Sequence, residues 1–173
     1  MTEIINMLVS MGGVIMQIVA IVLVFCFFFN KKDNEIFTFF SKKGVLFSSL
    51  ISLGGMIISL YYSEIAGFEP CALCWYQRIF LYSTAFILGL SLFKKDKYVI
   101  PYAVFLSLMG SLFALYHTLL PFLSSDILCG DVSCTKNYFT YFGYITIPIL
   151  SLTSFILIAV LLVIAKDYHA KNS

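Results

Sequence analysis

Five long apolar runs, separated by short polar breaks, constrain this sequence more than any other feature. They span residues 4–29, 44–62, 75–93, 98–119 and 145–165. An α-helix rises about 1.5 Å per residue, so each run can cross a hydrocarbon core about 30 Å thick. The runs lack the alternation of barrel strands, and only helices and closed barrels satisfy their backbone in lipid. We therefore predict an all-α integral membrane protein with five transmembrane helices.

The composition supports lipid as the surroundings of these helices. Of the 173 residues, 61% are hydrophobic and only 12% are charged, whereas soluble domains have about 25% charged residues. So short a chain could not bury this much apolar surface in its own core. A net charge of +2 is too small to suggest nucleic-acid binding, and no P-loop, zinc-finger or RNA-binding pattern occurs.

The first apolar run could be mistaken for a signal peptide. However, residues 1–30 contain no Lys or Arg, and the run is longer than the apolar region of a signal peptide. We therefore expect a retained helix.

The placement of basic residues predicts the orientation of the helices. Cytoplasmic loops are enriched in Lys and Arg, and nine of the eleven basic residues lie in three segments that must share one side. We predict an N-terminus outside and a C-terminus in the cytoplasm. The nine residues are Lys31, Lys32, Lys42, Lys43, Lys94, Lys95, Lys97, Lys166 and Lys171.

Four of the five cysteines fall in the two segments predicted to lie outside, residues 63–74 and 120–144. They form the pairs Cys71–Cys74 and Cys129–Cys134, whereas Cys26 lies within the first helix. A disulfide requires Cα atoms within about 7 Å. We therefore expect Cys26, near the cytoplasmic half of its helix, to take no part in exchange with the other four.

The first pair is a C-x-x-C motif that follows Pro70 at the start of the third helix. The positive end of a helix stabilises a thiolate, which is the nucleophile in disulfide exchange. The pattern favours a redox-active dithiol, although such a motif alone is only moderately specific. Two alternatives remain open, namely structural disulfides and a zinc site formed by all four cysteines.

Two polar residues are predicted at the depth of this motif. Arg78 is the only arginine of the chain and lies one turn after Cys74; it either extends to the headgroups or holds a negatively charged acceptor beside the thiols. His117 lies near the outer end of the fourth helix, either as a rim residue or as part of the same site.

The electrons of a dithiol at this position need an acceptor. The sequence has no haem, flavin or nicotinamide motif, so a quinone dissolved in the membrane is the acceptor that we predict. Aromatic residues at that level could pack the quinone ring or form an ordinary interfacial belt; they are Tyr61, Tyr62, Trp75 and Tyr76.

Several segments together resemble one family. Cys71-Ala72-Leu73-Cys74-Trp75-Tyr76-Gln77-Arg78, the second cysteine pair, Tyr116-His117-Thr118 and Phe142-Gly143-Tyr144-Ile145-Thr146-Ile147-Pro148 are similar to the disulfide bond formation protein B family, especially its Gram-positive-type members (BdbC). The resemblance covers residues 44–165 and implies a four-helix redox bundle there. Residues 1–30 would then be an extra N-terminal transmembrane helix and residues 166–173 a cytoplasmic tail.

The resemblance also implies a function. Such a protein sits in the bacterial cytoplasmic membrane, reoxidises a thioredoxin-like extracytoplasmic thiol oxidase (DsbA/BdbD-type) and passes electrons to ubiquinone or menaquinone. By this likeness, Cys129 forms the mixed disulfide with the partner and Cys134 links transiently to Cys71. Cys74 would face the quinone beside Arg78, with His117 nearby.

Two other functions remain open. Vitamin K epoxide reductase-like proteins share a helical bundle, a C-x-x-C and a loop pair, but the order of these motifs is reversed here. The second open function is that of a non-catalytic membrane protein with structural or metal-binding cysteines. The second pair is also spaced more closely than in Gram-negative members, with only Gly130-Asp131-Val132-Ser133 between its cysteines.

Overall fold

The computed structural model describes residues 2–28, 35–94, 98–123, 133–135 and 138–171. Their elements, in chain order, are α1 (Thr2–Phe28), α2 (Glu35–Leu60), the π-helical turn η1 (Tyr61–Ile65), α3 (Ala72–Lys94), α4 (Ile100–Leu123) and α5 (Ile147–Lys171). Within these residues, extended pairing is limited to one isolated bridge between Tyr141 and Ile145. The predicted all-α fold is confirmed.

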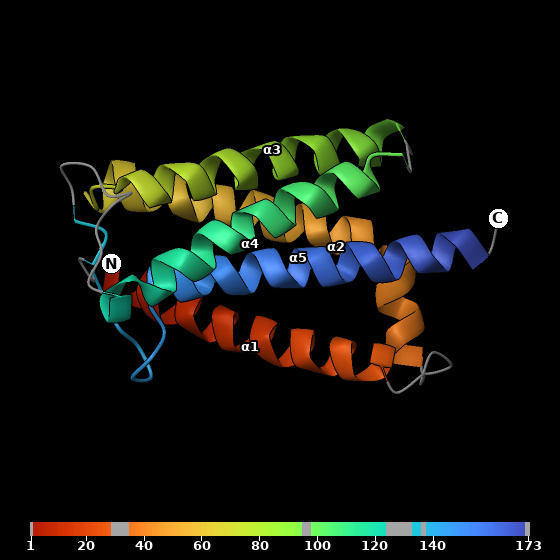
Figure 1. The fold of residues 1–173 in the computed structure, drawn as a ribbon, viewed down its shortest axis with the longest axis horizontal. Coiled ribbons are helices and arrows are strands. Elements are labelled where there is room, and N and C mark those ends of the chain that lie inside the picture. The colour runs from red at the N-terminus through yellow and green to blue at the C-terminus, as the bar shows by residue number, and fades with distance from the viewer. Residues whose placement is uncertain (1, 29–34, 95–97, 124–132, 136–137, 172–173) are drawn as a thin grey trace.

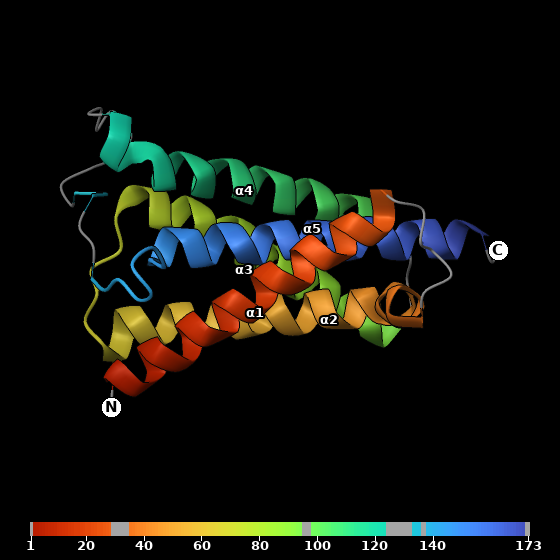
Figure 2. The same ribbon diagram turned by 90° about the horizontal axis from the view of Figure 1, so that it is seen from below.

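Helices α2 to α5 form a four-helix bundle. Helix α2 packs against α3 and α5, and α4 packs against the same two helices, so the four close into a ring. Helix α1 lies outside this ring and packs on α5, which it crosses obliquely (Figures 1 and 2). The arrangement is the predicted bundle with one additional N-terminal helix.

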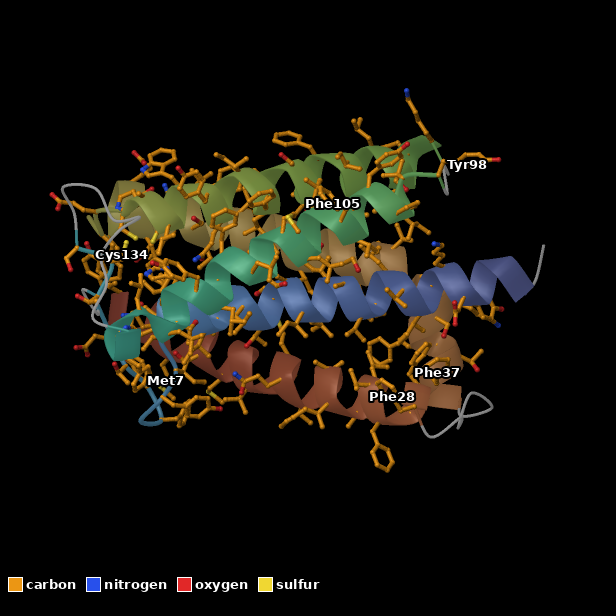
Figure 3. The ribbon with its side chains drawn as sticks, viewed as in Figure 1. Met7, Phe28, Phe37, Tyr98, Phe105 and Cys134 are labelled. Atoms are coloured by element: carbon orange, nitrogen blue, oxygen red, sulfur yellow. The ribbon has the colours of Figure 1, made fainter. Side chains whose placement is uncertain are left out.

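The helices are suited to a membrane. Among the described residues, four candidate spans are long and apolar enough to cross one: Thr2–Phe28, Phe37–Ile65, Ile100–Phe122 and Ile147–Tyr168. Helix α3 is less apolar, but its 23 residues would extend about 34 Å, and it lies alongside the others (Figure 1). Large apolar side chains such as Phe28 project from the bundle (Figure 3). The chain is therefore a multi-pass membrane protein.

The predicted start of the second helix at residue 44 is wrong. Helix α2 begins at Glu35 and continues through Lys42 and Lys43, which are exposed, while Phe37 and Ser41 are buried. Lysine has a good helix propensity, so the charged pair lies on the outer side of the helix and does not interrupt it. The fifth helix likewise continues to Lys171, beyond the predicted residue 165.

Two glycines allow close contacts with α5. A Cβ atom at Gly44 would lie 2.7 Å from the backbone oxygen of Leu161, and one at Gly110 would overlap the ring of Phe155. Small residues at helix contacts are typical of membrane proteins, where close backbone approach stabilises the association. These contacts bring α2 and α4 against the same central helix and thereby set the width of the bundle.

Candidate active site

The first cysteine pair lies at the start of α3, as predicted. Cys71 precedes the helix, and its carbonyl oxygen accepts a hydrogen bond of 3.2 Å from the backbone N–H of Trp75. The Cys71 side chain is 4% exposed, and Cys74 is half-buried. Both are free thiols, with their Sγ atoms 3.2 Å apart. The structure therefore holds the C-x-x-C motif as a reduced dithiol.

Helix α4 places His117 against this dithiol. The His117 Nε2 atom lies 3.9 Å from Cys71 Sγ and 3.0 Å from the backbone oxygen of Cys134. Because a carbonyl oxygen only accepts hydrogen bonds, Nε2 must carry the hydrogen. In the neutral ring Nδ1 is then an acceptor, and Gln77 Nε2 donates to it at 3.0 Å. Gln77 therefore fixes both the tautomer and the orientation of His117.

These contacts determine which thiol ionises. The pKa of Cys71 is lowered to about 4, first by the hydrogen bond from Cys74 and then by His117, although burial opposes the shift. A hydrogen bond to the charged form stabilises that form. Cys71 is therefore the more acidic thiol of the reduced pair, and it is the one more readily converted to the nucleophilic thiolate.

Arg78 is held between two helices. Its Nε atom donates to Ser59 Oγ at 2.9 Å and its Nη2 atom to the backbone oxygen of Ser59 at 3.0 Å. The guanidinium carbon also lies 5.2 Å from the centroid of the Trp75 ring, a distance at which a cation is attracted to an aromatic face. The side chain is thus bound to α2 and to the Trp75 ring of its own helix.

A cavity of about 330 Å³ joins these residues. Its wall includes both thiols of the first pair, Arg78 and His117. Tyr62 also lines it; this residue is 6% exposed, and its hydroxyl has no hydrogen-bond partner among the described residues. Ligand pockets typically measure about 300–1,000 Å³ and carry a few converging polar groups in an apolar wall. The cavity meets this description.

The second pair is only partly described. Cys134 is disulfide-bonded, 5% exposed and packed with Cys71 and Leu73. It lies at the end of the bundle where the chain begins (Figure 3). Cys129 lies outside the described residues. Cys26 is a free, buried thiol packed among apolar residues of α1, α2 and α5.

Three ligand atoms of this site are also close enough for a metal ion. Those of Cys71, Cys74 and His117 lie within 4.8 Å of one another. A structural zinc site requires four ligands, and the Nε2 atom of His117 already donates to Cys134. Because Cys134 is disulfide-bonded, the four-thiolate site considered from the sequence is not formed in this state.

Sequence reasoning assigns no role to Gln77 or Ser59. Gln77 offers a signal, since it is a polar residue at the start of an apolar run and is buried there. Ser59 offers none, because it is one of several serines on α2. Only the packing of α2 against α3 shows that it binds Arg78.

Comparison with known proteins agrees with the family resemblance of the sequence motifs. The sequence profile of the family described as "Disulfide bond formation protein DsbB" matches residues 41–165. A "Probable disulfide formation protein C" from Halalkalibacterium halodurans is 45% identical over 118 residues, covering 66% of this chain and 86% of the relative. The "SPbeta prophage-derived disulfide bond formation protein B" of Bacillus subtilis is 44% identical over 124 residues, covering 70% and 84%.

A third relative is matched over almost its whole length. A "Probable disulfide formation protein C 2" from Bacillus anthracis is 38% identical over 138 residues, which cover 99% of the relative but 78% of this chain. No solved structure matches this chain.

Proposed function

Because this chain belongs to the DsbB family and so takes part in disulfide bond formation at a membrane, we propose that it is a thiol:quinone oxidoreductase. One observation carries the proposal: the dithiol of Cys71 and Cys74 lines a cavity that also contains Arg78 and His117. In this cavity a pair of thiols lies beside a cation and an imidazole in a largely apolar wall.

The proposed reaction is a relay of two disulfide exchanges and one electron transfer. A reduced dithiol of the partner attacks the Cys129–Cys134 disulfide, leaves oxidised, and reduces that pair. The second pair then reduces the Cys71–Cys74 disulfide through a transient Cys134–Cys71 bond. Finally, the first pair closes to a disulfide as two electrons and two protons pass to the quinone. Each exchange breaks one S–S bond and forms another.

The residues of the cavity fit a quinone, which we treat as the electron-accepting substrate. A quinone has two carbonyl oxygens that accept hydrogen bonds. Two residues of the cavity wall have donors without a hydrogen-bond partner among the described residues, namely the remaining N–H groups of Arg78 and the hydroxyl of Tyr62. Arg78 would stabilise negative charge on the acceptor, and the family resemblance supports either ubiquinone or menaquinone.

The partner that we propose is a thioredoxin-like thiol oxidase outside the cytoplasm. The proposal rests on the family and on the position of Cys134, which packs with Cys71 at one end of the bundle.

The orientation proposed from the basic residues can be tested directly. After reduction, Cys71, Cys74, Cys129 and Cys134 are expected to react with a membrane-impermeant maleimide added outside intact cells, whereas Cys26 is expected not to react. Single-cysteine variants identify each labelled site. Labelling of the loop cysteines only in inverted vesicles would contradict the orientation.

The proposed activity is tested by following quinone absorbance with the purified protein and a dithiol. The parent is expected to reduce the quinone, whereas Cys71→Ser and Cys74→Ser are expected to be inactive because neither variant can close the disulfide. Metal analysis of the same samples addresses the alternative favoured by the Cys71–Cys74–His117 cluster. Stoichiometric zinc together with no quinone reduction would replace the redox proposal with a metal site.

A further inference from the structure

Helix α1 lies outside the part of the chain that the family profile matches, which begins at residue 41. Nevertheless, α1 contributes to the redox cavity: Val9 and Met16 line it, together with residues of α2, α3 and α5. Helix α1 packs on α5, so the cavity is bounded by α1 on one side and α2 on the other. The additional helix is therefore part of the wall of the proposed site.

The thiol, cationic and imidazole groups of this cavity come from two helices, whereas α1 and α2 contribute mainly apolar residues. The thiols, Arg78 and His117 come from the start of α3 and from α4. The apolar wall extends along α2 from Ile58 through Gly54 to Leu50, over about two turns. Leu50 is 56% exposed, so this wall reaches the lipid-facing surface of the bundle. A ligand with a polar ring and an apolar tail matches such a gradient.

We infer that α1 and α2 together form the binding site for the apolar tail of the quinone, with Met16 on one side and Gly54 on the other. The inference rests on the proposed quinone oxidoreductase function and adds a second part to its substrate site. A cavity of about 330 Å³ is near the lower limit for a ligand pocket. It therefore holds the ring and the first part of the tail, and the rest of the tail extends into lipid between the two helices.

Specific contacts hold α1 in register for this role. Gln17 Nε2 donates to Thr153 Oγ1 on α5 at 3.2 Å, and the Tyr144 hydroxyl donates to Gln17 Oε1 at 2.8 Å. One turn earlier, Gly13 lies directly against Leu150. Hydrogen bonds between helices in lipid, and small residues at their contacts, stabilise such packing. With Gln17 fixed on α5, the neighbouring Met16 is positioned at the cavity.

The test compares binding of two naphthoquinones, one with a long prenyl tail and one without a tail. Trp75 is the only tryptophan and lies against Arg78, so quenching of its fluorescence reports binding without turnover. Met16→Phe and Gly54→Leu fill the proposed tail site. Each is expected to raise the Kd for the tailed quinone about tenfold through overpacking, while the Kd for the tailless quinone stays unchanged.

The chain offers matched controls for both variants. Ile15→Phe adds the same ring one residue away, on a side chain that is 61% exposed. Gly89→Leu adds a leucine side chain at another glycine. A Cβ atom added at Gly89 would have no heavy atom within 4 Å, as at Gly54. Unlike Gly54, Gly89 does not line the cavity. Both controls are expected to bind the two quinones as the parent does.

The remaining outcomes each overturn a stated idea. An equal rise in Kd for both quinones, or no rise for either, would contradict the tail site, as would a parent that binds both with the same affinity. A parent that neither binds nor reduces either quinone would instead overturn the proposed function. The two filling variants lie on different helices, so a variant that fails to fold leaves the other to decide.

Discussion

Arg78→Met is expected to raise the apparent KM for the quinone about ten- to hundred-fold. The bonds to Ser59 use two of the five N–H groups of the guanidinium. Among the described residues the other three have no hydrogen-bond partner, and Arg78 lines the cavity. A hydrogen bond to a charged group contributes about 1.5–3 kcal/mol, which corresponds to the expected change in affinity. Quinone-dependent initial rates at saturating dithiol measure it.

Two further variants separate the possible causes of this loss. Arg78→Lys keeps the charge but loses the planar fork, so it is expected to retain part of the affinity. Ser59→Ala removes only the side-chain acceptor of Arg78, and a loss of about 1 kcal/mol, or about fivefold, is expected. If Lys restored full affinity and Met lowered only the yield of protein, Arg78 would be an interfacial anchor and the proposed quinone site would be wrong.

Cys134→Ser is expected to abolish oxidation of the protein partner while leaving reoxidation of the Cys71–Cys74 pair by quinone intact. The second disulfide cannot form without Cys134. The first pair keeps its direct contact with His117, and the substitution retains the backbone oxygen of residue 134 to which His117 donates. Cys129→Ser is expected to behave in the same way. Partner oxidation and single-turnover quinone reduction by the pre-reduced protein measure the two steps separately.

Cys26→Ala is the matched control for these cysteine variants. Cys26 is a free thiol buried in an apolar cluster, where it behaves as a small apolar residue. Its replacement is expected to leave both steps unchanged. If Cys134→Ser also prevented quinone from reoxidising the first pair, the order of the relay would be wrong.

The sequence predicts the helices well because long apolar runs are a strong local signal. It predicts their ends less well: the charges of Lys42 and Lys43 indicate a break, yet α2 passes through them because only one side of the helix is buried there. The positions of the first cysteine pair, Arg78 and His117 along their helices predict that they lie at the same depth in the membrane. In the structure all four residues line the same cavity.

The parts of the site that the sequence does not predict depend on how separate helices face one another. The bond from Gln77 to His117 joins α3 to α4, and the bond from Arg78 to Ser59 joins α3 to α2. Residue spacing along one helix contains no information about either contact. The same is true of Met16, whose position at the cavity follows from the packing of α1 on α5.

The single N–H of His117 has two acceptors, the backbone oxygen of Cys134 and the sulfur of Cys71. A negative charge on that sulfur draws the hydrogen away from the carbonyl and so weakens the bond between α4 and residue 134. Conversely, loss of the bond to the carbonyl leaves the N–H entirely to the sulfur. The contact of His117 with residue 134 and its stabilisation of the Cys71 thiolate are therefore reciprocally linked.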